Sequence, residues 1–219
     1  MGVSPRYTGD GGRAYADWQL RAVDIMGKEA ARRFRPYVYA SDDCLDFGCG
    51  GGSILAALKV ASRRGVEPNE QPRINATRRG IDAVASLADV PSESVDVVIS
   101  NHALEHCRSP FEELTEMQRV LRPQGRLVLV LPMDDWRRSR RFLAQDINSH
   151  LYAWAPLHIG NLVTDVGLHV DSVDIIRHAY PLGVRLLWQG LPEMVFDVIC
   201  GVWSVVFLRR QIRVVAHRP

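Results

Sequence analysis

A glycine-rich segment begins at Asp46 with the sequence DFGCGGG, between a short apolar run and a helical pattern. Glycine backbones turn tightly and allow a ligand to approach closely, and a helix start can hold a polar ligand group. The segment is therefore typical of a loop that binds a cofactor. Taken alone it is weak evidence, because ordinary tight turns also use glycine.

Glu67 strengthens this interpretation through its position in the sequence. It ends the next predicted strand, about 20 residues after Asp46, where a carboxylate can accept hydrogen bonds from both hydroxyls of a ribose. The glycines follow the pattern G-x-G-x-G, whereas a dinucleotide fingerprint needs G-x-G-x-x-G. The loop and the carboxylate together favour a nucleoside ligand, and the glycine spacing disfavours NAD.

With these residues the chain resembles the Rossmann-like (class I) S-adenosylmethionine-dependent methyltransferases, in particular the small bacterial members of the type 11 and type 23 domain families. The resemblance continues in order and spacing through RGVEPNEQPRINATRRGI, LADVPSESVDVVISNHALEH and EMQRVLRPQGRLVLVLP, and it covers roughly residues 40–132. It implies S-adenosyl-L-methionine as the cofactor. The cofactor-binding residues that it implies are Asp46, Gly48, Cys49, Gly50, Gly52, Glu67, Ser86, Leu87 and Asn101.

The resemblance also divides the cofactor among these residues. The glycine loop with Asp46 would hold the methionyl part, and Glu67 would hold the ribose. Ser86 and Leu87 would flank the adenine, with Ser86 standing where the family often has Asp. Asn101 would line the cofactor near its methionyl group.

The segment His102-Ala-Leu-Glu105-His106 allows three interpretations. Similar methyltransferases carry an L-E-H turn without a metal, in which polar groups cap a helix and line the pocket, and we favour this interpretation. Enzymes that resemble the ubiquinone-pathway O-methyltransferases have E-x-x-E-H here and bind a divalent ion, but His102 replaces the first Glu. An inverted zinc-protease motif would use Glu105 as a base, and it would leave the glycine loop unexplained. We therefore expect no metal.

The segment 146–154, DINSHLYAW, places a carboxylate, an imidazole and two aromatic rings after the fifth predicted strand. It resembles D-x-N-x-H-x-Y-x-W segments in bacterial methyltransferases of glycan or cell-envelope gene clusters. That likeness implies a small-molecule, glycan or lipid-linked acceptor. His150, His102 and His106 are the candidate catalytic bases that would remove a proton from the acceptor. Local turn and packing roles remain the alternative for the segment.

Two further features are weaker. The segment WRRSRR at 136–141 could bind an anionic substrate or could be a solvated loop. Tyr7, Tyr15 and Trp18 could close over the sulfonium or the acceptor, or could pack in a core.

The elements that must position these residues alternate between short buried strands and helical patterns, which indicates a doubly wound α/β fold. We expect a mostly parallel seven-stranded sheet with an antiparallel last strand. Ser109 and Glu112 predict a capping box for a helix that continues to Leu121 and is ended by Pro123 and Gly125. The strands expected up to residue 132 are 44–47, one ending at 66–67, one including 83–85, 95–100 and 126–131. A helix is expected to begin at Ser53 and to continue through ILAALKVA. Beyond residue 156 we expect a helix at 158–167, a strand at 169–176, an apolar segment and a last strand at 211–217.

The chain of 219 residues fits one methyltransferase domain. Its expected parts are an N-terminal helical cap at 1–40, a cofactor-binding core at 41–132 and an acceptor-side segment at 133–219. The net charge of +2 is too balanced for binding nucleic acid by charge alone, and no nucleic acid partner is expected. Four cysteines without C-x-x-C spacing favour reduced thiols and a cytoplasmic location.

The stretch from Met194 to Leu208 is the longest apolar one, and Asp197 interrupts it. It is shorter than the roughly 20 residues that cross a bilayer, and we expect a core-packed helix. Contact with a membrane surface or a lipid-linked substrate is the alternative. The N-terminal sequence MGVSPRYTGDGG has no apolar core of the kind that a signal peptide needs.

The expected activity is methyl transfer from S-adenosylmethionine to the acceptor, most simply at oxygen. A non-catalytic, cofactor-binding regulator would keep Glu67 and the glycines but lack a working base. A nicotinamide-dependent oxidoreductase is the other rival, disfavoured by the glycine spacing.

Overall fold

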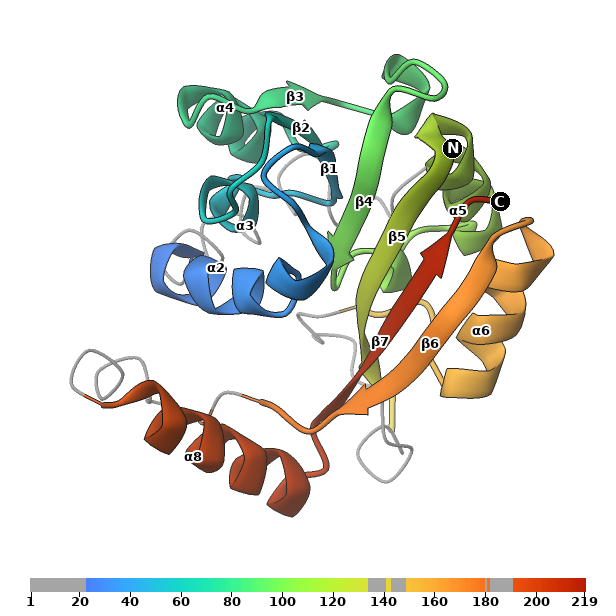
Figure 1. Cartoon of the computed structure of the whole chain (residues 1–219). Coiled ribbons are helices and arrows are strands. Elements are labelled where there is room, and N and C mark those ends of the chain that lie inside the picture. The colour runs from blue at the N-terminus through green and yellow to red at the C-terminus, as the bar shows by residue number, and fades with distance from the viewer. Residues whose placement is uncertain (1–22, 134–140, 143–148, 180, 182–190) are drawn as a thin grey trace.

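A computed structural model describes residues 23–133, 141–142, 149–179, 181 and 191–219, and Figure 1 shows its elements. Their centre is a seven-stranded sheet with the order β3-β2-β1-β4-β5-β7-β6. Neighbouring strands from β3 to β5 are parallel, and β7 is antiparallel to both β5 and β6. This confirms the expected fold class. The strands are β1 (Asp43–Phe47), β2 (Ser62–Val66), β3 (Asp82–Val84), β4 (Val95–Asn101), β5 (Leu121–Met133), β6 (His169–Ile176) and β7 (Arg210–His217).

Helices cover both faces of the sheet, and successive residues of its central strands point to opposite faces. On β4, Val98 lies in one core and its neighbours Val97 and Ile99 lie in the other. The first core includes α5 and α6, and the second includes α2, α3 and α4; Figure 1 shows these two groups on opposite sides. The helices are α2 (Val23–Arg32), α3 (Ser53–Ala56), α4 (Glu70–Arg78), α5 (Pro110–Val120), α6 (Pro156–Asp165) and α8 (Glu193–Val206), with 3-10 turns η2 (Arg35–Tyr37), η3 (Leu87–Asp89) and η4 (Leu104–His106).

The order of the strands reverses between β1 and β4. From β1 the chain proceeds outward to β2 and β3, and it then returns to the other side of β1 as β4. At such a switch point the connections after the two strands diverge, and open α/β sheets bind their ligands there. The glycine-rich segment follows β1 and the HALEH segment follows β4, so the fold brings both to this place.

Two predicted helix boundaries are wrong. The helix that begins at Ser53 is a single turn, because Arg63 donates hydrogen bonds to the carbonyls of Leu55 and Leu58 and the chain turns into β2. Helix α5 ends at Val120, before Pro123 and Gly125, because Leu121 already pairs with β4.

The predicted capping box at Ser109 is also wrong. Ser109 is the N-cap of α5 and Pro110 its first residue, as expected, but the Ser109 side chain makes no capping hydrogen bond. A capping box forms instead at Ser86, whose hydroxyl accepts from Ala88 while Asp89 accepts from the Ser86 backbone N–H.

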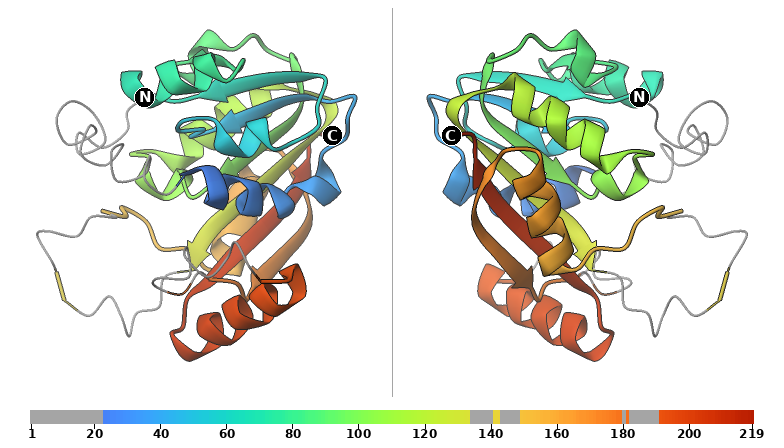
Figure 2. Two further views of the ribbon diagram at one scale, coloured as in Figure 1. Left: turned by 90° about the vertical axis from the view of Figure 1, so that its left-hand side faces the viewer. Right: turned by 90° about the vertical axis from the view of Figure 1, so that its right-hand side faces the viewer.

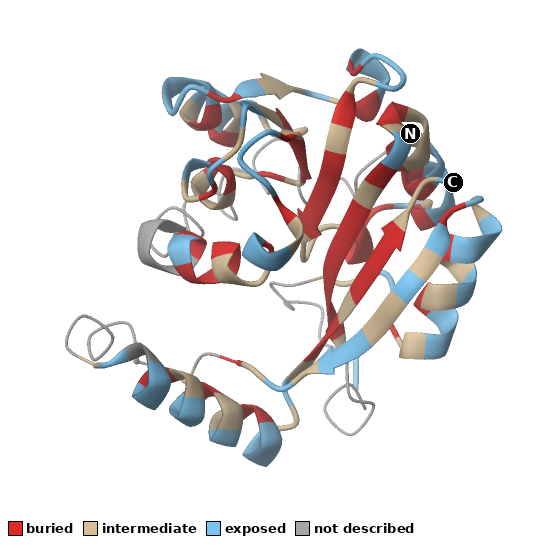
Figure 3. Ribbon diagram, in the orientation of Figure 1, coloured by how far each residue is buried: buried red, intermediate tan, exposed pale blue. Residues whose placement is uncertain are grey.

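The apolar stretch at 194–208 forms a helix, α8, but only one of its faces is packed in the core. Phe196 and Cys200 are buried, whereas Met194, Val198 and Val202 are exposed. Figure 3 shows exposed positions in pale blue along α8. The expectation of a core-packed helix therefore holds for the inner face alone. Within the described residues, no helix combines the length and the apolar character that crossing a membrane requires.

Candidate active site

The glycine-rich segment forms a tight loop directly after β1. The backbone N–H groups of Gly48 and Cys49 both donate to the carbonyl of Val66, at 2.9 and 3.1 Å. Gly48, Gly50 and Gly52 have φ angles of 76°, 52° and 77°, in the left-handed region that favours glycine. A Cβ at Gly48 would also clash with the Cβ of Ala103, so the glycine lets the loop lie directly against the HALEH segment.

Asp46 places a buried carboxylate beneath this loop. The residue is 1% exposed, and neither carboxylate oxygen has a hydrogen-bond partner among the residues that the structure describes. Burial raises the pKa of Asp46 well above its ordinary value, and the nearby Glu67 carboxylate raises it further. An unpaired buried carboxylate is costly, and a cationic ligand group would offset that cost.

Asn101 places a second buried polar atom at the same point, from the last position of β4. Its Oδ1 atom has no hydrogen-bond partner within the described part of the chain. The neighbouring strands β1 and β4 are aligned with Phe47 opposite Ser100, and the Ser100 hydroxyl donates to the Phe47 carbonyl at 3.0 Å. Asp46 and Asn101 therefore supply unsatisfied acceptors at the switch point, where a ligand with donors and positive charge fits.

Glu67 lies directly after β2 and connects two loops. One of its carboxylate oxygens accepts from the N–H of Gly50 at 3.1 Å, and the other accepts from the N–H of Asn69 at 2.8 Å. Burial raises the pKa of Glu67, while these two hydrogen bonds lower it. Each carboxylate oxygen can accept a further hydrogen bond, so the side chain can still receive two ribose hydroxyls.

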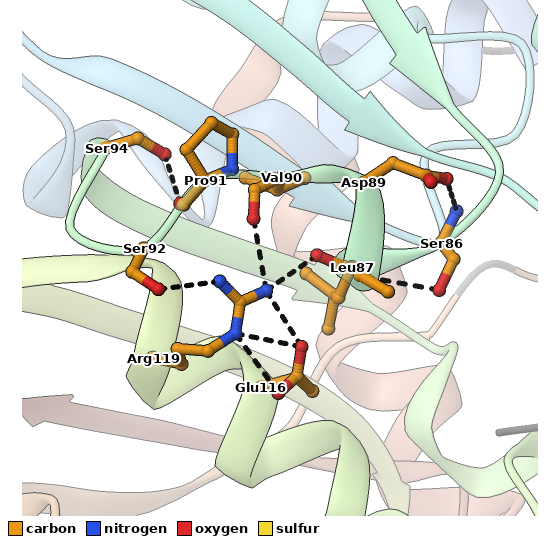
Figure 4. A network of polar contacts seen from close by, with 10 residues as sticks. Ser86, Leu87, Asp89, Val90, Pro91, Ser92, Ser94, Glu116 and Arg119 are labelled. Carbon is orange, nitrogen blue, oxygen red and sulfur yellow. Dashed lines mark hydrogen bonds and ion pairs between the residues drawn. The ribbon is translucent and has the colours of Figure 1, made fainter.

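The loop after β3 is held by Arg119, which the sequence analysis did not single out. Arg119 donates to the carbonyls of Leu87 and Val90 and to the Ser92 hydroxyl, at distances of 2.9 to 3.0 Å (Figure 4). The Leu87 side chain is buried in the core, so a contact with adenine would have to come from its backbone. An arginine in the last turn of a helix is common, and the sequence carried no signal for this role.

The HALEH segment forms a 3-10 turn rather than an α-helix. His102 has a positive φ of 54°, which is uncommon outside glycine, and its N–H donates to the carbonyl of Val130. Glu105 is fully buried, and its Oε1 lies 3.6 Å from Nδ1 of His102 and 4.0 Å from Nε2 of His106. The N-cap residues of η4 and α5, Ala103 and Ser109, make no capping hydrogen bond through their side chains, and a capping role for the polar HALEH residues stays a prediction.

The segment after β5 returns to this turn and adds His150. The rings of His106 and His150 meet edge to face with centroids 5.1 Å apart. The N–H of Leu151 donates to the carbonyl of Glu105 at 2.9 Å, and the Tyr152 hydroxyl donates to the backbone at 2.8 Å. Ligand atoms of Glu105, His106 and His150 all lie within 4.8 Å of one another, so this cluster could accept a proton or hold a metal ion.

The structure thus brings most of the predicted site residues to one edge of the sheet. The cofactor candidates lie at or directly after the ends of β1 to β4, and the histidine candidates lie around Glu105. Ala103 joins the two groups, because it lies directly against Gly48. The sequence did not predict that the buried carboxylate of Glu105 would lie between the candidate histidines. The predicted residues Tyr7, Tyr15, Trp18, Asp146 and those at 136–140 lie outside the described residues.

Residues 45–129 match the family model of a methyltransferase domain. Over these residues the chain therefore carries a methyltransferase domain. An uncharacterized methyltransferase of Schizosaccharomyces pombe is 35% identical over 127 residues, which are 51% of this chain and 48% of that protein. The chain spans 37% to 51% of the length of the curated relatives that it matches.

Solved structures show the same fold. A chain from the complex between the Haloferax volcanii Trm112 methyltransferase activator and a methyltransferase aligns with a TM-score of 0.69 and 19% identity, covering 100% of this chain and 99% of its own. A geranyl diphosphate C-methyltransferase of Streptomyces coelicolor, in complex with Mg²⁺, geranyl diphosphate and S-adenosylhomocysteine, aligns with a TM-score of 0.63 and 17% identity, covering 89% and 77%. The methyltransferase domain expected from the sequence is confirmed by the family model, and the expected fold is confirmed by these structures.

Replacement of Glu67 tests the ribose contact. We expect Glu67→Ala to weaken binding of S-adenosylhomocysteine by about 1.5–3 kcal/mol, the usual contribution of hydrogen bonds to a charged group. Isothermal titration calorimetry measures this, with Glu70→Ala as the control because Glu70 is exposed at the start of α4. Equal affinities of the wild type and Glu67→Ala would remove Glu67 from the cofactor site.

Proposed function

We propose that this methyltransferase domain transfers the methyl group of S-adenosylmethionine to an oxygen atom of a glycan, lipid-linked or other small-molecule acceptor. The observation that supports this most is the pair of unsatisfied acceptors, Asp46 and Asn101, at the switch point beside the glycine loop. The cofactor carries an ammonium group and a sulfonium, which match these acceptors, and its ribose matches Glu67. Ser86 and the backbone of Leu87 border the place assigned to the adenine.

The histidine cluster supports a base for the acceptor hydroxyl. When bound, the cofactor supplies a reactive methyl group, whose carbon–sulfur bond breaks as the bond to the acceptor oxygen forms. The protein then has to align the acceptor and remove its proton. We assign the removal of this proton to His150 or His106, with His102 as the third candidate. The buried carboxylate of Glu105 lies beside the pair, and the pair lies at the edge of the sheet where we expect the acceptor to bind.

The rival interpretations have less support. A pyrophosphate would rest on the N-terminus of a long helix after the glycine loop, and α3 is only one turn, which disfavours a nicotinamide cofactor. A non-catalytic regulator would not need a buried carboxylate with two imidazoles beside the cofactor. The three-part division of the chain and the cytoplasmic location remain predictions.

Isotope transfer tests the proposed activity. The full chain, incubated with a cell extract and the deuteromethyl cofactor, is expected to produce a metabolite or lipid-linked glycan that is heavier by one labelled methyl group. We expect the transfer to persist in EDTA, because His102 breaks the oxygen-rich pattern that suits magnesium. Mass spectrometry locates the label, and a control without protein reports background transfer.

Two outcomes would contradict parts of this proposal. Label on carbon or nitrogen would exclude O-methylation. Loss of transfer in EDTA, restored by a divalent ion, would assign a metal to the cluster of Glu105, His106 and His150, whose ligand atoms are close enough to converge on an ion.

A further inference from the structure

Helix α8 is apolar on its outer face and carries its polar residues on its inner face. Asp197 points inward, where its carboxylate pairs with Arg32 at 2.9 Å and lies 3.5 Å from His178. Phe196, Cys200 and Ser204 are buried. The outer residues, which we call the α8 apolar face, are 36% to 78% exposed and are Met194, Val195, Val198, Ile199, Val202, Val205 and Val206.

The chain topology places α8 at the edge of the sheet where ligands bind. Strand β6 is parallel to β5, because each is antiparallel to β7. The chain therefore leaves β6 at the same edge as the glycine loop and the HALEH turn, and α8 lies between this point and the start of β7. Figures 1 and 2 show α8 beyond this edge, where the ion pair of Asp197 with Arg32 joins it to α2.

We propose that the α8 apolar face inserts into a lipid surface with anionic headgroups. Within 194–208 Asp197 is the only charged residue, and it is turned toward Arg32, so the outer face offers apolar groups alone. A protein partner would usually add about ten hydrogen bonds and a polar rim, whereas the acyl region of a lipid layer requires neither. Helices that lie in the membrane interface bury an apolar face of this kind.

Charged and aromatic residues at the ends of the segment fit the headgroup region. Arg177, whose carbonyl lies close to Gly201 of α8, and Arg209 after the helix are both exposed, and they can approach anionic phosphates. Trp203 and Phe207 form a pair with ring centroids 3.8 Å apart near the C-terminal end of α8. Aromatic rings beside arginines are typical of the membrane–water interface. Arg177 and Arg209 outweigh Glu193, the acidic residue that begins α8, so the charge beside the apolar face is complementary to an anionic surface.

The dimensions of α8 favour a lipid surface over a second copy of the chain. Its 14 residues form a rod about 21 Å long and about 10 Å wide. A strip of this size is small compared with the roughly 800 Å² per partner of a stable protein interface. It is also too short to span a bilayer, which needs about 20 residues, so the helix would lie in the plane of the surface.

Docking through α8 would turn the ligand-binding edge of the sheet toward the membrane. Resting on the proposed function, this selects the lipid-linked class among the acceptors, because such an acceptor would enter the site from the lipid layer. The docking itself does not depend on methyl transfer, so the two proposals can fail separately.

Vesicle flotation of the full chain tests the docking. We expect the wild type to float with phosphatidylcholine vesicles that contain phosphatidylglycerol, and less with phosphatidylcholine alone. In the double variant Val198→Asp/Val202→Asp, the fraction of protein that floats with the vesicles is expected to fall at least tenfold, because two charges would have to enter the acyl boundary. The matched control is Ile74→Asp/Leu157→Asp, which places two charges at exposed apolar positions on α4 and α6.

Each outcome decides the proposal. Loss of flotation in the α8 variant alone would support it. Unchanged binding of S-adenosylhomocysteine by this variant would show that the domain is still folded. A wild type that floats with neither vesicle, or an α8 variant that floats like the wild type, would overturn it. The face would belong to a second copy of the chain instead if the wild type does not float but forms a dimer in light scattering, and if the α8 variant is a monomer.

Discussion

Asp46→Asn is expected to make the cofactor-free protein more stable while it loses most of its affinity for S-adenosylhomocysteine. The wild-type carboxylate is buried without a hydrogen-bond partner among the described residues, and the neutral amide avoids the cost of a buried charge. We expect a gain of about 1–3 kcal/mol, which raises Tm by several degrees. Loss of the carboxylate beneath the glycine loop is expected to weaken binding by about 2–4 kcal/mol.

The pH dependence of this difference follows from the raised pKa of Asp46. A carboxyl group whose pKa is higher in the folded state costs stability as the pH rises above its unfolded value, near 4. The advantage of Asp46→Asn is therefore expected at pH 7 and should vanish well below pH 4, where the wild-type group is protonated in both states. Differential scanning calorimetry at several pH values measures this.

Asp43→Asn is the matched control, because Asp43 lies at the other end of β1. Its carboxylate accepts from Ser62 and pairs with Arg122 at 2.9 Å, and these contacts lower its pKa. This variant should lose a little stability and keep its cofactor affinity. An Asp46→Asn protein that is less stable and binds S-adenosylhomocysteine normally would show that Asp46 has a structural role only.

His150→Ala is expected to lower kcat by about 100-fold or more, the usual effect of removing a positioned acid or base. Affinity for S-adenosylhomocysteine should stay nearly unchanged, because His150 contacts His106 and lies on the acceptor side of the turn. The measurements are methyl transfer to the acceptor found by isotope transfer and calorimetry of cofactor binding. His158→Ala serves as the control, since His158 is exposed on α6.

Other results for His150→Ala would show that His150 is not the catalytic base. An intact kcat in His150→Ala would leave His106 or His102 as the candidate. A fall in cofactor affinity together with kcat would show that the segment around His150 shapes the cofactor pocket rather than the acceptor site.

The sequence predicted the sheet and the cofactor loop well because both depend on local patterns. Short β-branched runs mark buried parallel strands, and glycines at 48, 50 and 52 are required by positive φ angles. The spacing to Glu67 reflects one strand–helix–strand unit, so it could also be recognised.

The errors arose where contacts between distant residues decide the local structure. Arg63 ends α3 after one turn, and pairing with β4 ends α5 early. Arg119 stabilises the loop after β3 from a helix that is remote in sequence. Approach of His150 to Glu105 and exposure of one face of α8 depend on tertiary packing, and hydrophobic periodicity does not encode either.

Calorimetric titration of the full chain with S-adenosylhomocysteine and with NAD tests the central claim most directly, since both ligands would occupy the switch point between β1 and β4. We predict binding of S-adenosylhomocysteine at one site per chain, and no displacement of it by NAD. Tighter binding of NAD than of S-adenosylhomocysteine would contradict the assignment of the glycine loop, Asp46 and Glu67 to a methyl-donor site.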